Sequence, residues 1–344
     1  MQFRRTPVAG VVYNTTLTRP DAALTLALLY SLEGKREARV ASIAVTENSF
    51  GAAAFADAVF RFYQLGTIPN ANRSLPIGLA ADKPFPPDSP MVKAALDRVN
   101  DKGEPLYKRG LRRVSDTAEV TALMRNSLAY IDDGWVSVIL SAPATYLARI
   151  LNYPGSAELI KSKVRTTIVS ECRQDPAAMR RLLAEWPTPF VFCGRDTGQT
   201  LLYPAAAIEQ DFTWAPAHPV IDFYRAAKPM PYDAPAQDLI AAFYAIHPDS
   251  PFFQLSPGAI TVAEDRSLSF TPSPEGKHKR LAIEPAKKDQ LLAALRQAVG
   301  AKPVPPQPRR RFTPEEIEKF RREREEEQRK RELEERKAVT KPTP

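Results

Sequence analysis

The chain has 344 residues, enough to bury the core of one large domain or of two modest ones. Its apolar content of 44% and charged content of 26% are typical of a globular protein. The net charge of +8 is small for this length, and lysine and arginine are scattered or alternate with glutamate. Since a nucleic-acid-binding protein gathers its basic residues on one face, the composition argues against a nucleic-acid partner.

No run of the sequence reaches the roughly 18 apolar residues that span a bilayer. The N-terminus passes directly into a strand-like run without the apolar segment of a signal peptide. We therefore expect a cytoplasmic protein without a membrane contact, although Arg4 and Arg5 leave open an export signal that has been trimmed. The two cysteines, Cys172 and Cys193, form no metal or redox motif and are expected to be buried free thiols.

Short apolar runs alternate with segments of helical periodicity through the first two hundred residues. The predicted strands are 11–13, 39–45, 75–79, 136–140, 166–169 and 190–193. The predicted helices are 21–32, 52–63, 91–98, 117–130, 145–151 and 176–186. Helices 219–227 and 235–246, strands 259–263, 267–271 and 280–283, and a helix 285–299 follow. This order predicts an α/β fold with a mostly parallel central sheet flanked by helices, and ligands at the carboxyl ends of the strands.

The C-terminal part differs in composition from the rest. Residues 1–300 are predicted to form the domain, 301–312 a proline-rich linker, and 313–344 a charged helical tail. Thr313 and Pro314 give a helix start, and glutamates pair with basic residues four positions later. We expect a solvated helix; the alternative is that Ile317 and Phe320 dock on the domain or on a protein partner.

Several motifs occur in an order that points to one family. They are Asn14 to Ala22 after the first strand, Val45 to Asn48 after the second, Leu140 to Ala148, Ala184 to Gly194, and Met230 to Leu239. From about Gly10 to Val299 this order resembles the inosine–uridine-preferring nucleoside hydrolase family. In that family the first stretch reads DxDxGxDDA and the third reads TGPLTNIA. The resemblance implies the nucleoside-hydrolase fold and hydrolysis of the N-glycosidic bond of a purine or pyrimidine nucleoside into base and ribose.

The resemblance also implies a calcium ion that binds water and the ribose hydroxyls, with an aspartate taking the proton of the water. It makes Asp21 a metal ligand and candidate catalytic residue, gives Ser141 a metal-binding carbonyl, and makes Asp238 the distal metal ligand. By the same resemblance, Asn48 and Asp196 would contact the ribose of a nucleoside or another ribosyl compound.

This sequence departs from the family at the aspartate motif. Read without a gap, the four aspartate positions are Asn14, Thr16, Pro20 and Asp21; with one residue deleted, Asp21 moves to the ribose-binding position and Ala22 takes the ligand position. A threonine hydroxyl cannot act as a general base near neutral pH. Because calcium requires several carboxylates and only Asp21 and Asp238 remain, we expect a degenerate calcium site that is weak or absent.

Two hypotheses follow from this. The first is a nucleoside hydrolase-like protein whose calcium-dependent catalysis is impaired or lost. The second is a pseudoenzyme that binds a nucleoside or interacts with a partner through its tail, and a homo-oligomer stays open under both. Asp21 and Asp238 have an alternative role as helix caps, and Asn48 as a turn residue. Asp196 would alternatively belong, with Glu171, Arg173 and Arg195, to salt-bridged surface loops.

Overall fold

The computed structural model describes residues 8–47, 49–65, 76–170, 174–304 and 322. The chain divides into two units, residues 1–305 and 306–344. The predicted tail helix, with Ile317 and Phe320, lies outside the described residues apart from Arg322. In the part that is described, no helix is long and apolar enough to cross a membrane.

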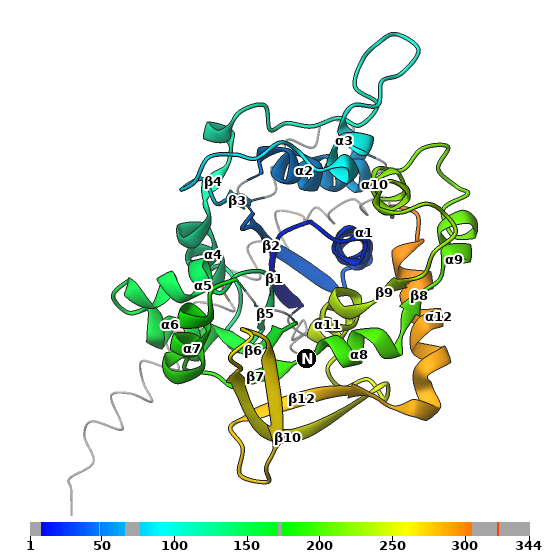
Figure 1. Ribbon diagram of the computed structural model, residues 1–344. Helices are drawn as coiled ribbons and strands as arrows, with labels where there is room; N and C mark the ends of the chain where they lie inside the picture. Colours follow the sequence, from blue (N-terminus) through cyan, green and yellow to red (C-terminus); the bar gives the residue numbers. More distant parts are fainter. Residues whose placement is uncertain (1–7, 48, 66–75, 171–173, 305–321, 323–344) are drawn as a thin grey trace, which may run out of the picture. The chain divides into compact units, whose positions relative to one another are not determined.

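A ten-stranded sheet forms the centre of the first unit, in the order β11-β10-β12-β7-β6-β5-β1-β2-β3-β4 (Figure 1). The strands from β12 to β4 run parallel, and β10 and β11 add an antiparallel hairpin at one edge. Their bounds are β1 Ala9–Thr15, β2 Ala38–Val45, β3 Ile77–Leu79, β4 Ala118–Glu119, β5 Val136–Ser141, β6 Val164–Val169, β7 Phe190–Phe192, β10 Phe253–Val262, β11 Leu268–Pro272 and β12 His278–Ile283. The predicted, mostly parallel sheet is confirmed.

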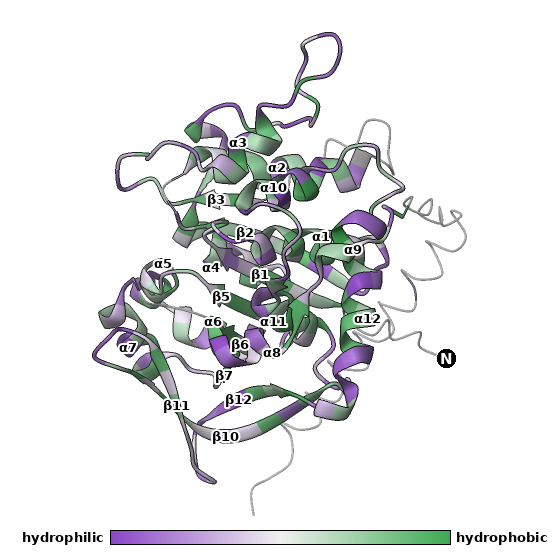
Figure 2. Ribbon diagram, turned by 45° about the vertical axis from the view of Figure 1, so that its right-hand side comes forward, coloured by the Kyte–Doolittle hydropathy of each residue, from purple (hydrophilic) through white to green (hydrophobic). Residues whose placement is uncertain are grey.

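Helices cover both faces of the sheet, and an apolar core lies under each set (Figures 1 and 2). One core contains side chains of α1 Pro20–Gly34, α2 Phe50–Leu65, α10 Pro219–Ala227, α11 Gln237–Ile246 and α12 Lys288–Val299. The other contains side chains of α4 Val120–Ala129, α5 Thr145–Arg149, α6 Ser156–Lys163 and α7 Pro176–Glu185. The described elements also include the short helices α3 Pro90–Leu96, α8 Arg195–Thr200 and α9 Ala205–Gln210 and the pair β8 Leu202–Tyr203 and β9 Ala234–Pro235. Three 3₁₀ helices, Val114–Asp116, Ile150–Asn152 and Pro285–Lys287, complete them.

The order of the strands fixes where a ligand site can form. From β1, the chain first adds β2, β3 and β4 on one side and then returns to add β5, β6 and β7 on the other. The carboxyl ends of β1 and β5 therefore form the switch point at which parallel sheets bind their ligands.

Three helices were missed by the sequence pattern. The sequences of α6, α8 and α9 are short, and α8 (RDTGQT) is polar with a central glycine. The predicted helix 117–130 begins only at Val120, because Glu119 accepts hydrogen bonds from the backbone N–H groups of Thr121 (3.0 Å) and Ala122 (2.6 Å) and so caps the helix there. Strand β10 begins at Phe253, six residues before its predicted start. The prediction missed these residues because most of them are exposed and form no apolar run.

Candidate functional site

The loop between β1 and α1 places charged side chains at the switch point. Arg19 precedes Pro20, which occupies the first helical position, and a residue before proline favours the extended conformation that Arg19 adopts. Leu17 has a φ of 53°, which is rare for a side chain of its kind, and its side chain is buried in the core. This burial compensates for the backbone strain and holds the turn, so that the Arg19 side chain reaches back over the end of the sheet.

Asp238, in the first turn of α11, is the centre of a buried polar cluster. Its carboxylate accepts hydrogen bonds from Tyr13 Oη (2.8 Å), Arg19 Nη2 (2.7 Å), Ser141 Oγ (2.6 Å) and Ser170 Oγ (3.2 Å). Its side chain is 0% exposed. Donors from the ends of β1, β5 and β6 thus meet on one carboxylate, which the fold places where the switch-point rule expects a site.

Asp21 lies beside Asp238. Its Oδ2 accepts a hydrogen bond from the backbone N–H of Asp238 (3.1 Å), and its Oδ1 pairs with Arg19 Nε (3.2 Å). Asp21 therefore accepts from the first turn of α11, while the capping position of its own helix is Arg19. Burial and the neighbouring carboxylate of Asp238 raise the pKa of Asp21 to about 7, against the opposing effect of Arg19.

Arg19 is the residue that the sequence interpretation missed. Its guanidinium contacts both carboxylates and donates to Ser141 Oγ (3.0 Å), and its side chain is 34% exposed. In the motif DxDxGxDDA it falls on an unspecified position, so comparing the motif letter by letter overlooks it. The available signal was a cationic residue next to a motif that has lost most of its carboxylates.

The residues present do not fit a calcium ion. Calcium takes six to eight oxygen ligands, but one carboxylate oxygen of Asp21, one of Asp238 and the hydroxyl of Ser141 are already bonded to the guanidinium of Arg19. Among the described residues, no group of three or more His, Cys, Asp or Glu side chains is placed to hold a metal ion. A calcium ion would have to displace Arg19.

None of the other motif positions adds a carboxylate to the cluster. Asn14 is buried, and its Nδ2 contacts Met124 Sδ (3.4 Å) on the α4 side of the sheet, since neighbouring strand residues point to opposite faces. Thr16 Oγ1 lies 2.8 Å from the hydroxyl of Thr18 at the exposed end of the loop. Pro20 is the first residue of α1, and Ala22 lies buried in its first turn.

The two residues expected at the ribose have different outcomes. Asn48 lies outside the described residues, as do Glu171, Cys172 and Arg173. Asp196, in the first turn of α8, forms an ion pair with Arg280, and its side chain is 53% exposed. In the described part of the chain, Asp196 thus pairs with a surface arginine rather than with the Asp238 cluster.

Gln237 connects the ends of two strands beside the cluster. Its Nε2 donates to the carbonyl oxygens of Ser170 (2.7 Å) and Cys193 (2.9 Å), which follow β6 and β7. Cys193 is a buried free thiol, as predicted, and burial raises the pKa of its thiol above the ordinary range. The thiol therefore stays protonated and is unsuited to act as a nucleophile.

Gly198 lets α8 approach this connection closely. A Cβ atom on Gly198 would lie 2.6 Å from Cβ and 3.1 Å from Cα of Gln237. Alanine inside a helix normally stabilises relative to glycine, but here it must push the backbone next to Asp238. We expect Gly198→Ala to lower the free energy of unfolding by about 1–3 kcal/mol, as overpacking does, measured by urea denaturation. An increase in stability would contradict the close approach.

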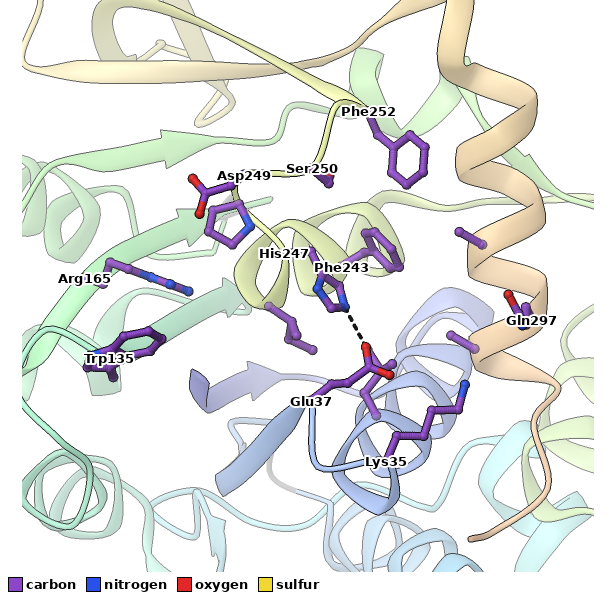
Figure 3. A pocket seen from close by; sticks show the side chains of 15 residues that line it. Lys35, Glu37, Trp135, Arg165, Phe243, His247, Asp249, Ser250, Phe252 and Gln297 are labelled. Carbon is purple, nitrogen blue, oxygen red and sulfur yellow. Dashed lines mark ion pairs between the residues drawn. The ribbon is translucent and has the colours of Figure 1, made fainter. Parts of the chain in front are cut away.

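A pocket of about 610 Å³ lies at the amino ends of the strands, on the side of the sheet away from the Asp238 cluster (Figure 3). Trp135 and Arg165 line it near the amino ends of β5 and β6, and His247 Nε2 pairs there with Glu37 (3.2 Å). Arg165 donates to the carbonyl oxygen of Ala245 (2.7 Å). None of its lining residues belongs to the Asp238 cluster, and parallel sheets bind ligands at the other edge.

The fold and the site define an α/β protein with a polar cluster at the switch point of a parallel sheet. No protein-family model matches the sequence, and no curated protein matches it. Solved structures do match. The inosine–uridine preferring nucleoside hydrolase of Bacillus anthracis has a TM-score of 0.58 at 12% identity, over 85% of this chain and 100% of that one.

Two further solved structures have a similar fold. A purine-preferring ribonucleoside hydrolase from Gardnerella vaginalis has a TM-score of 0.60 at 13% identity, over 85% of this chain and 98% of its own. A type III effector protein complexed with adenosine diphosphate ribose has a TM-score of 0.56 at 15% identity, over 87% and 96%. The chain therefore has the nucleoside hydrolase fold, as the order of its motifs predicts.

Proposed function

We propose that this protein binds a ribosyl compound at the carboxyl edge of its sheet and that calcium-dependent hydrolysis of the N-glycosidic bond is impaired or lost. One observation carries the proposal: the two carboxylates that remain, Asp21 and Asp238, are both committed to contacts within the chain. The similar structures support the ligand class, since they include nucleoside hydrolases and a complex with adenosine diphosphate ribose.

The arrangement can bind and orient a ligand. Thr16 and Thr18 are the hydroxyl-bearing residues at the open end of the loop, and Arg19 is the partly exposed member of the cluster. A sugar hydroxyl can exchange hydrogen bonds with such groups. The arrangement does not provide a general base that activates water. The resemblance assigns that role to the position of Thr16, and a threonine hydroxyl cannot take a proton from water near neutral pH.

A binding and turnover experiment on the full chain tests this proposal. Inosine, uridine and adenosine diphosphate ribose are titrated by calorimetry with and without calcium, and release of reducing sugar is followed in the same samples. We expect at least one compound to bind with an affinity that calcium does not change, and no release of ribose. Calcium-dependent release of ribose, or no binding of any of the three, would contradict the proposal.

A pair of variants tests where the ligand binds. Thr16→Val removes a hydroxyl at the proposed edge, and Thr213→Val removes an exposed hydroxyl on the loop after α9. Loss of one hydrogen bond should weaken binding about threefold to tenfold in Thr16→Val, from the 0.5–1.5 kcal/mol of a typical bond. Thr213→Val should bind as the unchanged protein does, and equal losses in both variants would place the ligand elsewhere.

A further inference from the structure

The Asp238 cluster contains two acidic side chains and one basic side chain. Asp238 is 0% exposed and Asp21 is 6% exposed, and buried carboxylates need a compensating positive charge. In the described part of the chain, Arg19 is the cation bonded to both: its Nε faces Asp21 Oδ1 and its Nη2 faces Asp238 Oδ1. One guanidinium therefore bridges two carboxylates that belong to different helices.

The charges at this point already balance without an added ion. Asp21 and Asp238 lie in the first turns of α1 and α11, and each helix N-terminus carries roughly half a positive charge. Together with the full charge of Arg19, these N-termini offset the two carboxylates. A divalent cation placed between Asp21 and Asp238 would add two further positive charges beside Arg19, so it would meet repulsion as well as occupied ligands.

The backbone holds Arg19 in this position. Pro20 limits Arg19 to the extended conformation, and the buried side chain of Leu17 fixes the preceding turn. The hydroxyl of Ser141 completes the arrangement, since it accepts from Arg19 Nη2 (3.0 Å) and donates to Asp238 Oδ1 (2.6 Å). The guanidinium of Arg19 thus donates to two carboxylates and one hydroxyl oxygen, which are acceptors suited to its positive charge.

We propose that the guanidinium of Arg19 is the permanent cation of this site and occupies the place in which Asp21, Asp238 and Ser141 would otherwise hold a divalent metal ion. This inference rests on the proposed function and explains it. A guanidinium binds and orients acceptor groups, but it cannot lower the pKa of a bound water as a metal ion does. The fold thereby keeps an electrostatically complete site that needs no calcium.

Removal of the guanidinium tests the inference. Arg19→Ala leaves both carboxylates and the serine facing a space that water or a cation can fill, and Arg19→Gln leaves an amide that keeps one donor and helps the variant to fold. We expect both to bind calcium with a dissociation constant of about 10⁻⁴ to 10⁻³ M, the range of weak calcium sites, measured by calorimetry near pH 8. We also expect calcium to raise their Tm.

Two variants serve as controls. Arg19→Lys keeps a positive charge in the site and should not bind calcium. Arg296→Ala removes a guanidinium of the same 34% exposure from the ion pair with Asp211, where a single carboxylate is present, and it should not bind calcium either. The unchanged protein should show no heat and no shift of Tm over the same range.

The outcomes separate the inference from the proposed function. If folded Arg19→Ala and Arg19→Gln bind no calcium, the inference is wrong while the ligand binding of the unchanged protein still stands. If the unchanged protein binds calcium as tightly as the variants do, Arg19 does not replace the ion. If the unchanged protein binds none of the three ribosyl compounds, the proposed function fails whatever the calcium titration shows.

Discussion

Replacement of Asp238 by alanine should lower the free energy of unfolding by about 3–5 kcal/mol, the usual cost of removing one partner of a buried ion pair. The carboxylate is 0% exposed and accepts from Tyr13, Arg19, Ser141 and Ser170. Its loss removes one of the two carboxylates that face Arg19 and leaves the buried hydroxyl of Tyr13 without this acceptor. The effect is measured by urea denaturation of the full chain followed by circular dichroism.

Two further variants serve as comparisons for Asp238→Ala. Asp238→Asn keeps an oxygen acceptor of the same shape and should cost less than Asp238→Ala. Asp97→Ala removes a carboxylate that is 66% exposed and paired with Lys93, and surface changes of this kind usually stay within about 0.5 kcal/mol. A cost for Asp238→Ala as small as that of Asp97→Ala would mean that the cluster is open to solvent.

Asp21 should lower the stability of the protein as the pH rises from about 4 to about 7, and Asp21→Asn should remove this contribution. Burial and Asp238 raise the pKa of Asp21 to about 7 from its ordinary value of 3.8. Between these values Asp21 holds a proton in the folded chain that it has released in the unfolded chain, so the stability that Asp21 contributes is largest below the lower value and is lost as the pH rises through the upper value. One such proton gives a slope of about 1.4 kcal/mol per pH unit.

The measurement is the free energy of unfolding at intervals from pH 4 to pH 8 for the unchanged protein and for Asp21→Asn. The asparagine oxygen can still accept the hydrogen bond from the backbone of Asp238. We expect the variant to gain stability relative to the unchanged protein as the pH rises from about 4 to about 7, because only the unchanged protein loses the contribution of Asp21. Thr213→Val, which changes no titratable group, should keep the original slope, and parallel curves for Asp21→Asn would contradict the raised pKa.

The local pattern of the sequence was sufficient for the main elements of the fold. The apolar runs that became β1, β2 and β5 lie between amphipathic or wholly apolar helices, and strands covered on both faces must be apolar throughout. The same pattern failed where burial is slight. Helix α6 buries only Ser156 and Ile160, and most of the early residues of β10 are exposed, so neither gives an apolar periodicity from which it could be predicted.

The site was only partly predictable, for a related reason. Asp21, Ser141 and Asp238 were expected near one another because the family resemblance assigns all three to one metal site, and the fold brings them together. The contact between Arg19 and Asp238 joins residues 219 positions apart, and no local rule assigns a partner at that distance. Asn14 and Asp196 were assigned by motif position, and their contacts with Met124 and Arg280 depend on side-chain direction and on neighbouring strands.

The sequence by itself determined, through its alternation of apolar runs and helical segments, that this chain forms a mostly parallel α/β sheet. The resemblance of its motifs to the nucleoside hydrolase family then identified an aspartate motif that keeps one carboxylate. The tertiary structure alone decided what compensates the buried charge. The distance between Asp21 and Asp238 is set by the packing of α1 against α11, and the turn at Leu17 directs Arg19 between them. Electrostatics in a buried site depends on distances of a few ångström between groups remote in sequence, and only the folded chain fixes those distances.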